Sequence, residues 1–331
     1  MGKISRVLVT CFMLWLLPAV SALAARPYKV LVVFSYEADF PWDVEIREGL
    51  ETVFKDTAEL HYFYMDTKVN LAAGQQKAAE AYALYRHLQP DGVIVADDNA
   101  QSMFVLPYLK DKVPTPVIFC GVNASPEAYG YPARNVTGIL ERFHLEETID
   151  FSRQFVPHIK TFAFLIKDSP VAKLILTQLN EDAGKLSADL VGFEQVRTAA
   201  QALRAAKDLR GKADLLIIES LQGVLGSDGQ PGNERQLVAQ VVDEFAGPTA
   251  ATNAYTVRYG ALSAVIKTGQ EQGGKAAQMM LQALQGTPMS EIPITRNYRG
   301  KRMVNVTTMQ RLGITPAPIS LRGAELVRTA Q

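Results

Sequence analysis

The chain has 331 residues, a length that predicts two domains at about 150 residues per domain, or one large α/β unit. Hydrophobic residues make up 48% and charged residues 21%, which excludes disorder as the dominant state. The 34 basic residues balance the 34 acidic ones, and this argues against a nucleic acid or an anionic membrane surface as partner. With four His and two Cys there are few metal ligands, so we expect no metal and no other cofactor.

The first residues are typical of a secretory signal peptide. Lys3 and Arg6 precede an apolar run over residues 7–17, and small residues follow it. The run is shorter than the roughly 20 apolar residues that span a bilayer, so a retained anchor is the less favoured interpretation. We expect residues 1–24 to be removed on export to the periplasm. Cys120 would then be alone, and a small buried role is favoured for it over a nucleophile.

The part of the chain that follows alternates short apolar runs with amphipathic stretches. Apolar and β-branched runs predict strands, and apolar residues at helical spacing predict helices between them. In the first half the predicted strands are 29–35, 61–66, 92–97 and 117–121, and the predicted helices are 43–54, 73–88 and 100–109. Strands that are apolar throughout and joined by helices indicate a parallel sheet that is covered on both faces.

The second half repeats this pattern. Its predicted strands are 162–167, 190–196, 215–219, 260–266 and 302–306, and its predicted helices are 171–186, 199–209, 234–245 and 273–284. The stretches 135–141 and 249–255 are candidate crossovers between the halves. We expect the helix 273–284 to return to the first half.

The fold that these elements predict is α/β, with two Rossmann-like lobes whose parallel sheets are joined by crossovers. The expected boundaries assign residues 28–138 and 252–288 to lobe 1. Residues 139–251 and 289–325 are assigned to lobe 2.

Recognised catalytic motifs are absent from the sequence. It contains no phosphate-binding P-loop, no G-x-G-x-x-G after a strand, no G-x-S-x-G and no H-E-x-x-H. This lowers the expectation of an enzyme without removing it.

Polar side chains gather where the predicted strands end, which is where open parallel sheets bind ligands. Most of these clusters precede a helix, whose unpaired N–H groups can hold an anionic group. A further candidate lies in the polar stretch 249–255, and aromatic residues follow the first strand. The candidate ligand-binding residues are Ser35, Tyr36, Trp42, Asp98, Asn99, Asn123, Asp168, Ser169, Glu219 and Asn253.

Several of these candidates have an equally simple structural interpretation. Asp98 and Asn99 are explained as well by helix N-capping, and a cap is favoured for Ser169. Glu219 is either a ligand partner or a solvated charge. For Trp42, a stacking wall of a binding site is slightly favoured over a plug at the base of the following helix.

Several stretches, taken in their order and spacing, resemble the type I periplasmic binding proteins. More specifically, they are similar to the ABC-transporter substrate-binding family that includes tryptophan- and tyrosine-type binding components. The matching stretches are VLVVFSYEADFPWDVEIREGLE (30–51), PDGVIVADDNAQ (90–101), PVIFCGVNASPEAYG (116–130), NVTGILE (135–141) and GKAAQMMLQALQGTPMSEIPI (274–294). The resemblance implies two lobes, joined by three crossovers, that close on a ligand. By position it implies ligand contacts from Ser35, Tyr36, Asp98, Asn99, Asn123, Asp168 and Ser169.

Three functional hypotheses follow. The leading one is a monomeric periplasmic receptor that delivers a small polar or aromatic ligand, with amino-acid-like compounds among the candidates, to an ABC permease in the inner membrane. The second is a receptor that presents its bound ligand to a membrane sensor kinase. The third and least favoured is a secreted enzyme, with Asp97 and Asp98 as acid and base, because neighbouring carboxyls can separate their pKa values.

Overall fold

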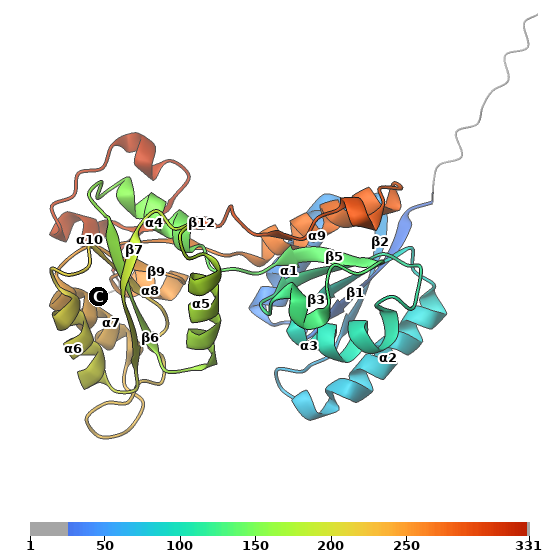
Figure 1. Cartoon of the computed structure of the whole chain (residues 1–331), viewed down its shortest axis with the longest axis horizontal. Coiled ribbons are helices and arrows are strands. Elements are labelled where there is room, and N and C mark those ends of the chain that lie inside the picture. Colours follow the sequence, from blue (N-terminus) through green and yellow to red (C-terminus); the bar gives the residue numbers. More distant parts are fainter. Residues whose placement is uncertain (1–25, 330–331) are drawn as a thin grey trace, which may run out of the picture.

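The computed structural model describes residues 26–329, so the expected signal peptide, 1–24, lies outside the described residues. Two α/β lobes lie next to each other along the long axis of the molecule (Figure 1). Three segments, 141–144, 267–268 and 297–300, connect elements of one lobe to elements of the other. We call them the first, second and third crossing segments. The predicted two-lobed α/β fold is therefore confirmed.

Lobe 1 contains a six-stranded parallel sheet in the order β11-β5-β4-β3-β1-β2. Helices α1 and α9 cover one face, and α2 and the helix at 101–109 cover the other. The strands are β1 (Tyr28–Phe34), β2 (Ala58–Tyr64), β3 (Gly92–Ala96), β4 (Val117–Val122), β5 (Val136–Leu140) and β11 (Thr295–Arg296). The helices are α1 (Pro41–Phe54), α2 (Gly74–Leu88), α3 (Asp98–Ala100), the helix Gln101–Leu109, and α9 (Gly269–Leu284).

Lobe 2 contains a seven-stranded sheet in the order β13-β12-β10-β9-β8-β6-β7, in which only the β10–β12 pair is antiparallel. Helices α4 and α5 cover one face, and α6 and α7 cover the other. The strands are β6 (Thr161–Lys167), β7 (Asp189–Val196), β8 (Leu215–Ile218), β9 (Thr249–Ala251), β10 (Ser263–Ile266), β12 (Lys301–Asn305) and β13 (Glu325–Val327). The helices are α4 (Leu145–Arg153), α5 (Pro170–Glu181), α6 (Ala199–Leu209), α7 (Glu234–Phe245), α8 (Ala254–Tyr259) and α10 (Val306–Arg311).

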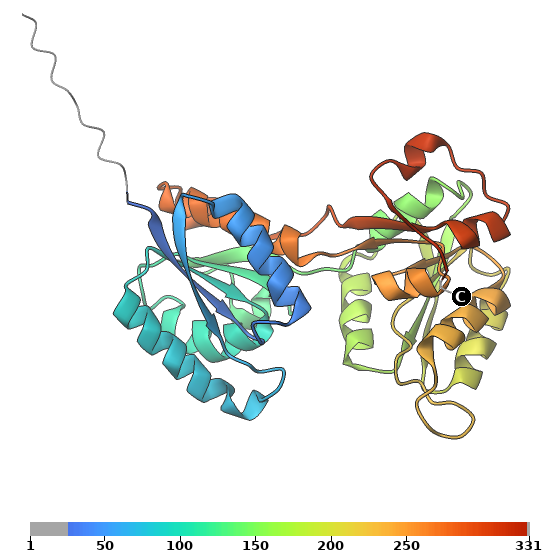
Figure 2. The ribbon, with the colours of Figure 1, turned by 180° about the vertical axis from the view of Figure 1, so that it is seen from behind.

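The expected return of helix 273–284 to the first half is confirmed, because α9 packs directly against α1 (Figure 2). The two backbones approach so closely that each contact needs a glycine. A Cβ on Gly273 would lie 2.0 Å from the carbonyl oxygen of Ile46, and one on Gly49 would lie 2.3 Å from that of Gln270. This glycine contact joins the late helix to the first lobe.

The sheets divide the chain at residues that differ from the expected boundaries. The stretch 249–255 is not a crossover, because it forms β9 and the start of α8, both in lobe 2. Strand β10 also belongs to the second sheet, and β11 belongs to the first. Hydrophobic periodicity predicts that a strand forms, but the partner strand decides which sheet it joins, and these short strands find their partners far along the chain.

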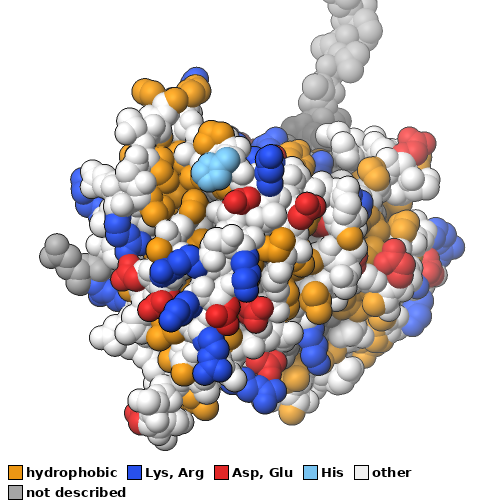
Figure 3. Space-filling view, turned by 60° about the vertical axis from the view of Figure 1, so that its left-hand side comes forward, with side chains coloured by type: hydrophobic (Ala, Val, Ile, Leu, Met, Phe, Trp, Pro, Cys, Tyr) orange, Lys and Arg blue, Asp and Glu red, His pale blue; other side chains and the backbone are white. Residues whose placement is uncertain are grey.

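The surface carries no large area of one charge on the face shown in Figure 3, where Lys and Arg side chains alternate with Asp and Glu. This agrees with the balanced composition. Among residues 26–329, no helix is both long enough and apolar enough to cross a bilayer. Cys120 is buried in β4, so its expected buried position is confirmed.

Candidate functional site

Two cavities flank the crossing segments, where the lobes face each other. The larger, of about 360 Å³, lies between the start of α1 in lobe 1 and the start of α8 in lobe 2. It is lined by Phe40, Pro41, Trp42, Glu45, Thr252, Asn253, Ala254, Tyr255, Ile266 and Lys267. The smaller, of about 180 Å³, lies between the first crossing segment and α5, and its lining includes Asn123, Glu141, Arg142, Phe143, Leu174 and Gln178. Residues of both lobes therefore line space at the carboxyl ends of the strands.

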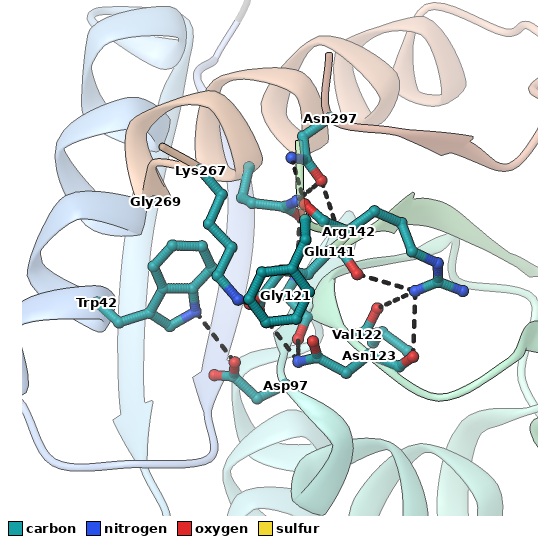
Figure 4. A network of polar contacts seen from close by, with 12 residues as sticks. Trp42, Asp97, Gly121, Val122, Asn123, Glu141, Arg142, Lys267, Gly269 and Asn297 are labelled. Carbon is teal, nitrogen blue, oxygen red and sulfur yellow. Dashed lines mark hydrogen bonds and ion pairs between the residues drawn. The ribbon is translucent and has the colours of Figure 1, made fainter. Parts of the chain in front are cut away.

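In the larger cavity, the indole of Trp42 is held by a buried carboxylate. Its Nε1 donates a hydrogen bond of 3.1 Å to Oδ1 of Asp97, the residue after β3 (Figure 4). Asp97 has a φ of 67°, in the left-handed region that residues other than glycine rarely adopt. In β4, Gly121 leaves the necessary room, because a Cβ there would lie 2.7 Å from Oδ1 of Asp97. The hydrogen bond between Trp42 and Asp97 thus depends on three elements: α1, the turn after β3, and β4.

Asp97 and Asp43 form a pair of buried carboxyls behind Trp42. Burial is the main cause that raises the pKa of Asp97 well above its ordinary value, and Asp43 and Glu141 raise it further. Asp43, in the first turn of α1, is 1% exposed, and burial raises its pKa to about 7. The backbone N–H of Tyr36 lowers that pKa only in part. Among residues 26–329, Oδ2 of Asp97 and both carboxylate oxygens of Asp43 lack a hydrogen-bond partner of ordinary geometry.

Lys267 of the second crossing segment forms an ion pair with Glu141 of the first. Its ammonium lies 4.1 Å from the ring centre of Phe143 and 6.0 Å from that of Trp42, both within the range of cation–π attraction. Glu141 also accepts a hydrogen bond of 3.2 Å from Nδ2 of Asn123. Figure 4 shows Lys267 beside Trp42 and extending toward Glu141. One lysine therefore meets two aromatic faces and a carboxylate between the cavities.

A second polar network ties the third crossing segment to the first. Asn297 is 2% exposed, and its amide exchanges two hydrogen bonds with the backbone of Arg142, at 2.8 and 2.9 Å. Its Nδ2 lies 2.9 Å from Nε2 of His144, and its Oδ1 accepts a bond of 3.2 Å from Gln272 in α9. Because all three crossing segments are joined in this way, a change in their relative angle would have to rearrange these contacts.

Ser35 and Asn99 are used within lobe 1. The Ser35 hydroxyl donates to the carbonyl of Ala96 at 2.8 Å and accepts from the N–H of Ala100 at 2.9 Å. The Asn99 amide donates to the hydroxyl of Thr67 at 2.9 Å. Ser35 is fully buried, so its side chain joins β1 to the turn after β3.

Asp98 is likewise engaged by its own lobe. Its carboxylate accepts hydrogen bonds from the N–H groups of Asn123 and Ala124, at 3.0 and 3.2 Å, and from the hydroxyl of Tyr129 at 2.8 Å. The side chain therefore neither caps its helix nor lines a cavity, and it positions the loop after β4. That loop in turn places Asn123 beside Glu141.

Tyr36 lies with its ring edge on Phe40, at a centroid distance of 5.2 Å, and the ammonium of Lys68 lies 4.4 Å from its ring centre. Burial raises the pKa of its hydroxyl above the ordinary range, and the carboxyls of Asp97 and Asp98 contribute. Tyr36 therefore stays protonated and is available as a hydrogen-bond donor on the same side of lobe 1 as Trp42.

The lobe 2 candidates separate into two groups. Asp168 is exposed and pairs with Arg197 at 2.6 Å, and it lines neither cavity. Ser169 precedes α5, yet within the described part of the chain its hydroxyl makes no capping hydrogen bond, unlike the expected cap. By contrast, Asn253 lines the larger cavity, and its Oδ1 caps α8 by accepting from Thr256 at 2.9 Å.

Glu219, which follows β8, is the other inward-lying candidate of lobe 2. Burial raises the pKa of its carboxyl, while the hydrogen bond from the backbone N–H of Ser220 and the charge of Lys267 lower it in part. The side chain of Glu219 is half-buried and accepts a hydrogen bond from the backbone N–H of Ser220.

The sequence interpretation did not single out Asp43, Glu141 or Lys267 for ligand contact, and it considered Asp97 only as part of an acid–base pair. A signal was present for Asp97, since it follows a buried strand directly, as Ser35 does. Lys267 and Glu141 are 126 residues apart, and local sequence patterns do not reveal their contact. Among residues 26–329, no group of His, Cys, Asp and Glu side chains is arranged to hold a metal ion.

The comparison with protein families gives one match over most of the chain. The family described as ABC transporter substrate binding protein matches residues 44–325. A tyrosine-binding protein from Clostridioides difficile (strain R20291) is 23% identical over 182 residues, which is 55% of this chain. The match spans about half the length of that curated relative, 50%.

Solved structures resemble the whole two-lobed chain. The ligand-free, open structure of a substrate-binding protein with adhesive properties from Clostridium difficile has a TM-score of 0.68 at 19% identity, and covers 92% of this chain and 100% of that one. A structure of an ABC domain in complex with L-Trp from Streptococcus pneumonia has a TM-score of 0.53 at 19% identity, and covers 91% and 99%. At such identities the likeness shows the fold alone, that of the type I periplasmic binding proteins.

Proposed function

Because this chain belongs to the family of ABC transporter substrate-binding proteins, we propose that it is the periplasmic solute receptor of an ABC importer. In this proposal its lobes close on a small polar or aromatic ligand of amino-acid-like character, and the loaded receptor docks on the permease as a monomer. Export by cleavage of residues 1–24 belongs to the same proposal. The names of a tyrosine-binding relative and of a structural relative in complex with L-Trp support this ligand class.

The observation that carries the proposal is the larger cavity, with Trp42 in its wall. A ligand there would contact lobe 1 through Trp42 and lobe 2 through Asn253 and Tyr255. Such contacts on both lobes favour a closed arrangement, since a ligand shifts an equilibrium only through contacts that differ between its two states. Nδ2 of Asn253, which lacks a partner among residues 26–329, offers a donor at this point.

We further propose which candidates touch the ligand and which act indirectly. Tyr36, Trp42, Asn123, Glu219 and Asn253 lie at or near the inner faces of the lobes and are proposed as contacts. Ser35, Asp98 and Asn99 have partners within lobe 1 and are proposed to shape the site. Asp168 and Ser169 line neither cavity and are proposed to play no part in binding.

The test is titration of the exported protein with L-tyrosine and L-tryptophan, followed by calorimetry and by small-angle scattering. We expect saturable binding of at least one of them and a smaller radius of gyration in the complex. Trp42 is the only tryptophan outside the expected signal peptide, so L-tyrosine can also be followed by its emission. Trp42→Phe, with Trp42 replaced by a smaller ring, should weaken binding by about tenfold.

Asp168→Asn serves as the control, because it alters a surface pair outside the cavities and should leave the affinity unchanged. If neither amino acid binds, the proposed ligand class is wrong. If binding occurs without any change in the radius of gyration, closure is wrong.

A further inference from the structure

We propose that Trp42, Phe143 and Glu141 form an ammonium-binding cage, which Lys267 fills with its own side chain and which the ligand's amine takes over on binding. The inference rests on the proposed function for its statement that the ligand enters between the lobes. It names the ligand class more closely, as a molecule with a protonated primary amine. Sugars and amine-free carboxylic acids are then poor ligands.

The cage already binds an ammonium group of the right kind. The Nζ of Lys267 lies over the ring of Phe143 at 4.1 Å and within 6.0 Å of the ring centre of Trp42, and it pairs with Glu141. A primary amine of a ligand has the same head group, with three N–H donors and one positive charge. Any surface that holds the lysine head group in this way can also hold a free amine.

The cage is built into rigid surroundings. The side chain of Glu141 is 7% exposed, and Nδ2 of Asn123 donates to its second oxygen. The Trp42 ring is fixed from behind by its bond to Asp97, for which the backbone adopts a φ of 67°. The amine subsite is thus preorganised on lobe 1 and the first crossing segment, while its present occupant comes from the second.

The charges around the cage favour a cation. Asp97 faces Asp43, Asp98 and Glu141, and each of these carboxyls makes its ionisation harder. Burial favours the neutral form of both Asp97 and Asp43. Glu141, which pairs with Lys267, is therefore the carboxylate that an incoming ammonium would meet.

Lys267 is free to leave the cage. The side chain of Lys267 is 23% exposed and lines the larger cavity, so it can leave the cage without unfolding the segment that carries it. Departure of Lys267 from Glu141 would break the ion pair that ties the second crossing segment to the first, so binding of an amine would be coupled to a change in the angle between the lobes.

The test compares three probes on the exported protein. Tyramine keeps the amine of tyrosine and lacks its carboxylate, 3-(4-hydroxyphenyl)propanoate keeps the carboxylate and lacks the amine, and methylammonium is the bare head group. Tyramine should bind more tightly than the propanoate. Lys267→Gln should raise the affinity for tyramine by about fivefold, since the lysine no longer competes with tyramine for the cage. Glu141→Gln should lower the affinity for tyramine by at least about tenfold.

Lys77→Gln is the matched control for the lysine, because the Lys77 ammonium also lies near an aromatic ring, that of Phe63 at 5.9 Å, and lines neither cavity. It should leave tyramine affinity unchanged. Circular dichroism and the melting temperature of each variant show whether it is folded. The proposed cage would be wrong if folded Lys267→Gln bound tyramine more weakly than the wild type does. It would also be wrong if the wild type bound the propanoate more tightly than tyramine.

Methylammonium separates this inference from the proposed function. In the millimolar range it should change Trp42 emission more than sodium chloride at equal ionic strength, and Glu141→Gln should abolish the difference. If that holds while L-tyrosine and L-tryptophan fail to bind, the cage stands and the amino-acid-like ligand is wrong. If methylammonium acts like sodium chloride, the cage is wrong, even where an aromatic amino acid binds.

Discussion

Replacement of Asp43 by Asn should make the protein more stable at alkaline pH and have little effect in acid. The carboxyl has an ordinary pKa of 3.8, and burial raises it to about 7 in the folded protein. Between these two pH values the unfolded chain has lost the proton that the folded chain keeps. The contribution of Asp43 to stability therefore falls as pH rises through this window, and this contribution levels off above about pH 7.

The size of the effect follows from the distance between the two pKa values. A shift from 3.8 to about 7 corresponds to roughly 4 kcal/mol at about 1.4 kcal/mol per pH unit. This is an upper bound, because relaxation around the charged form would reduce it. Asp43→Asn stays neutral at every pH, so its advantage over the wild type should grow by roughly 3 kcal/mol between pH 5 and pH 8.

Urea unfolding of both proteins at several pH values measures this difference directly. Glu48→Gln, which removes a carboxylate from the exposed side of the same helix, controls for the loss of one charge from α1. If the free energy of unfolding of Asp43→Asn and that of the wild type differ by the same amount at pH 5 and pH 8, then Asp43 is charged in the folded protein throughout. The description of Asp43 as a buried, protonated acid would be refuted.

Three further substitutions test the parts that hold the site. Gly273→Ala places a Cβ 2.0 Å from the carbonyl of Ile46, so it should force α9 away from α1 and cost at least about 3 kcal/mol in thermal unfolding; an unchanged melting temperature would contradict the direct helix contact. Asn297→Ala removes both bonds to the backbone of Arg142 and should cost about 2–3 kcal/mol in urea unfolding; a loss below 1 kcal/mol, by the same scale, would mean that water replaces the amide. Asp98→Ala should lower the free energy of unfolding by about 2 kcal/mol, because it loses its contacts with the loop after β4. A lower ligand affinity without any loss of stability would instead show that Asp98 contacts the ligand.

The longer strands and helices, and with them the two-lobed α/β fold, could be predicted from the sequence, whereas the strands β5, β9, β11 and β13 and the helices α4, α8 and α10 were not predicted. Strand β1 and helix α1 show why. A run of apolar residues over 29–35, followed by apolar residues at helical spacing over 43–54, carries its pattern within a few neighbouring residues. The position of Trp42 at the end of the first strand also led to the prediction of a cavity wall, and the structure places it in the lining of the larger cavity.

Which strand joins which sheet, and which side chains meet at the site, was decided by the tertiary structure. The sequence of strand β10 does not differ from that of other short apolar runs, but pairing with β9 and β12 places it in lobe 2. Because α9 belongs to lobe 1, Lys267, which follows β10, lies on a crossing segment. Asp98 and Asp97 are adjacent and alike in sequence, yet one is bound to the loop after β4 and the other faces Trp42 with an oxygen that lacks a partner among residues 26–329. The contact of Lys267 with Glu141 spans 126 residues. Local patterns fix the elements because they depend on near neighbours, whereas burial, charge and partner at the site depend on segments that only the folded chain brings together.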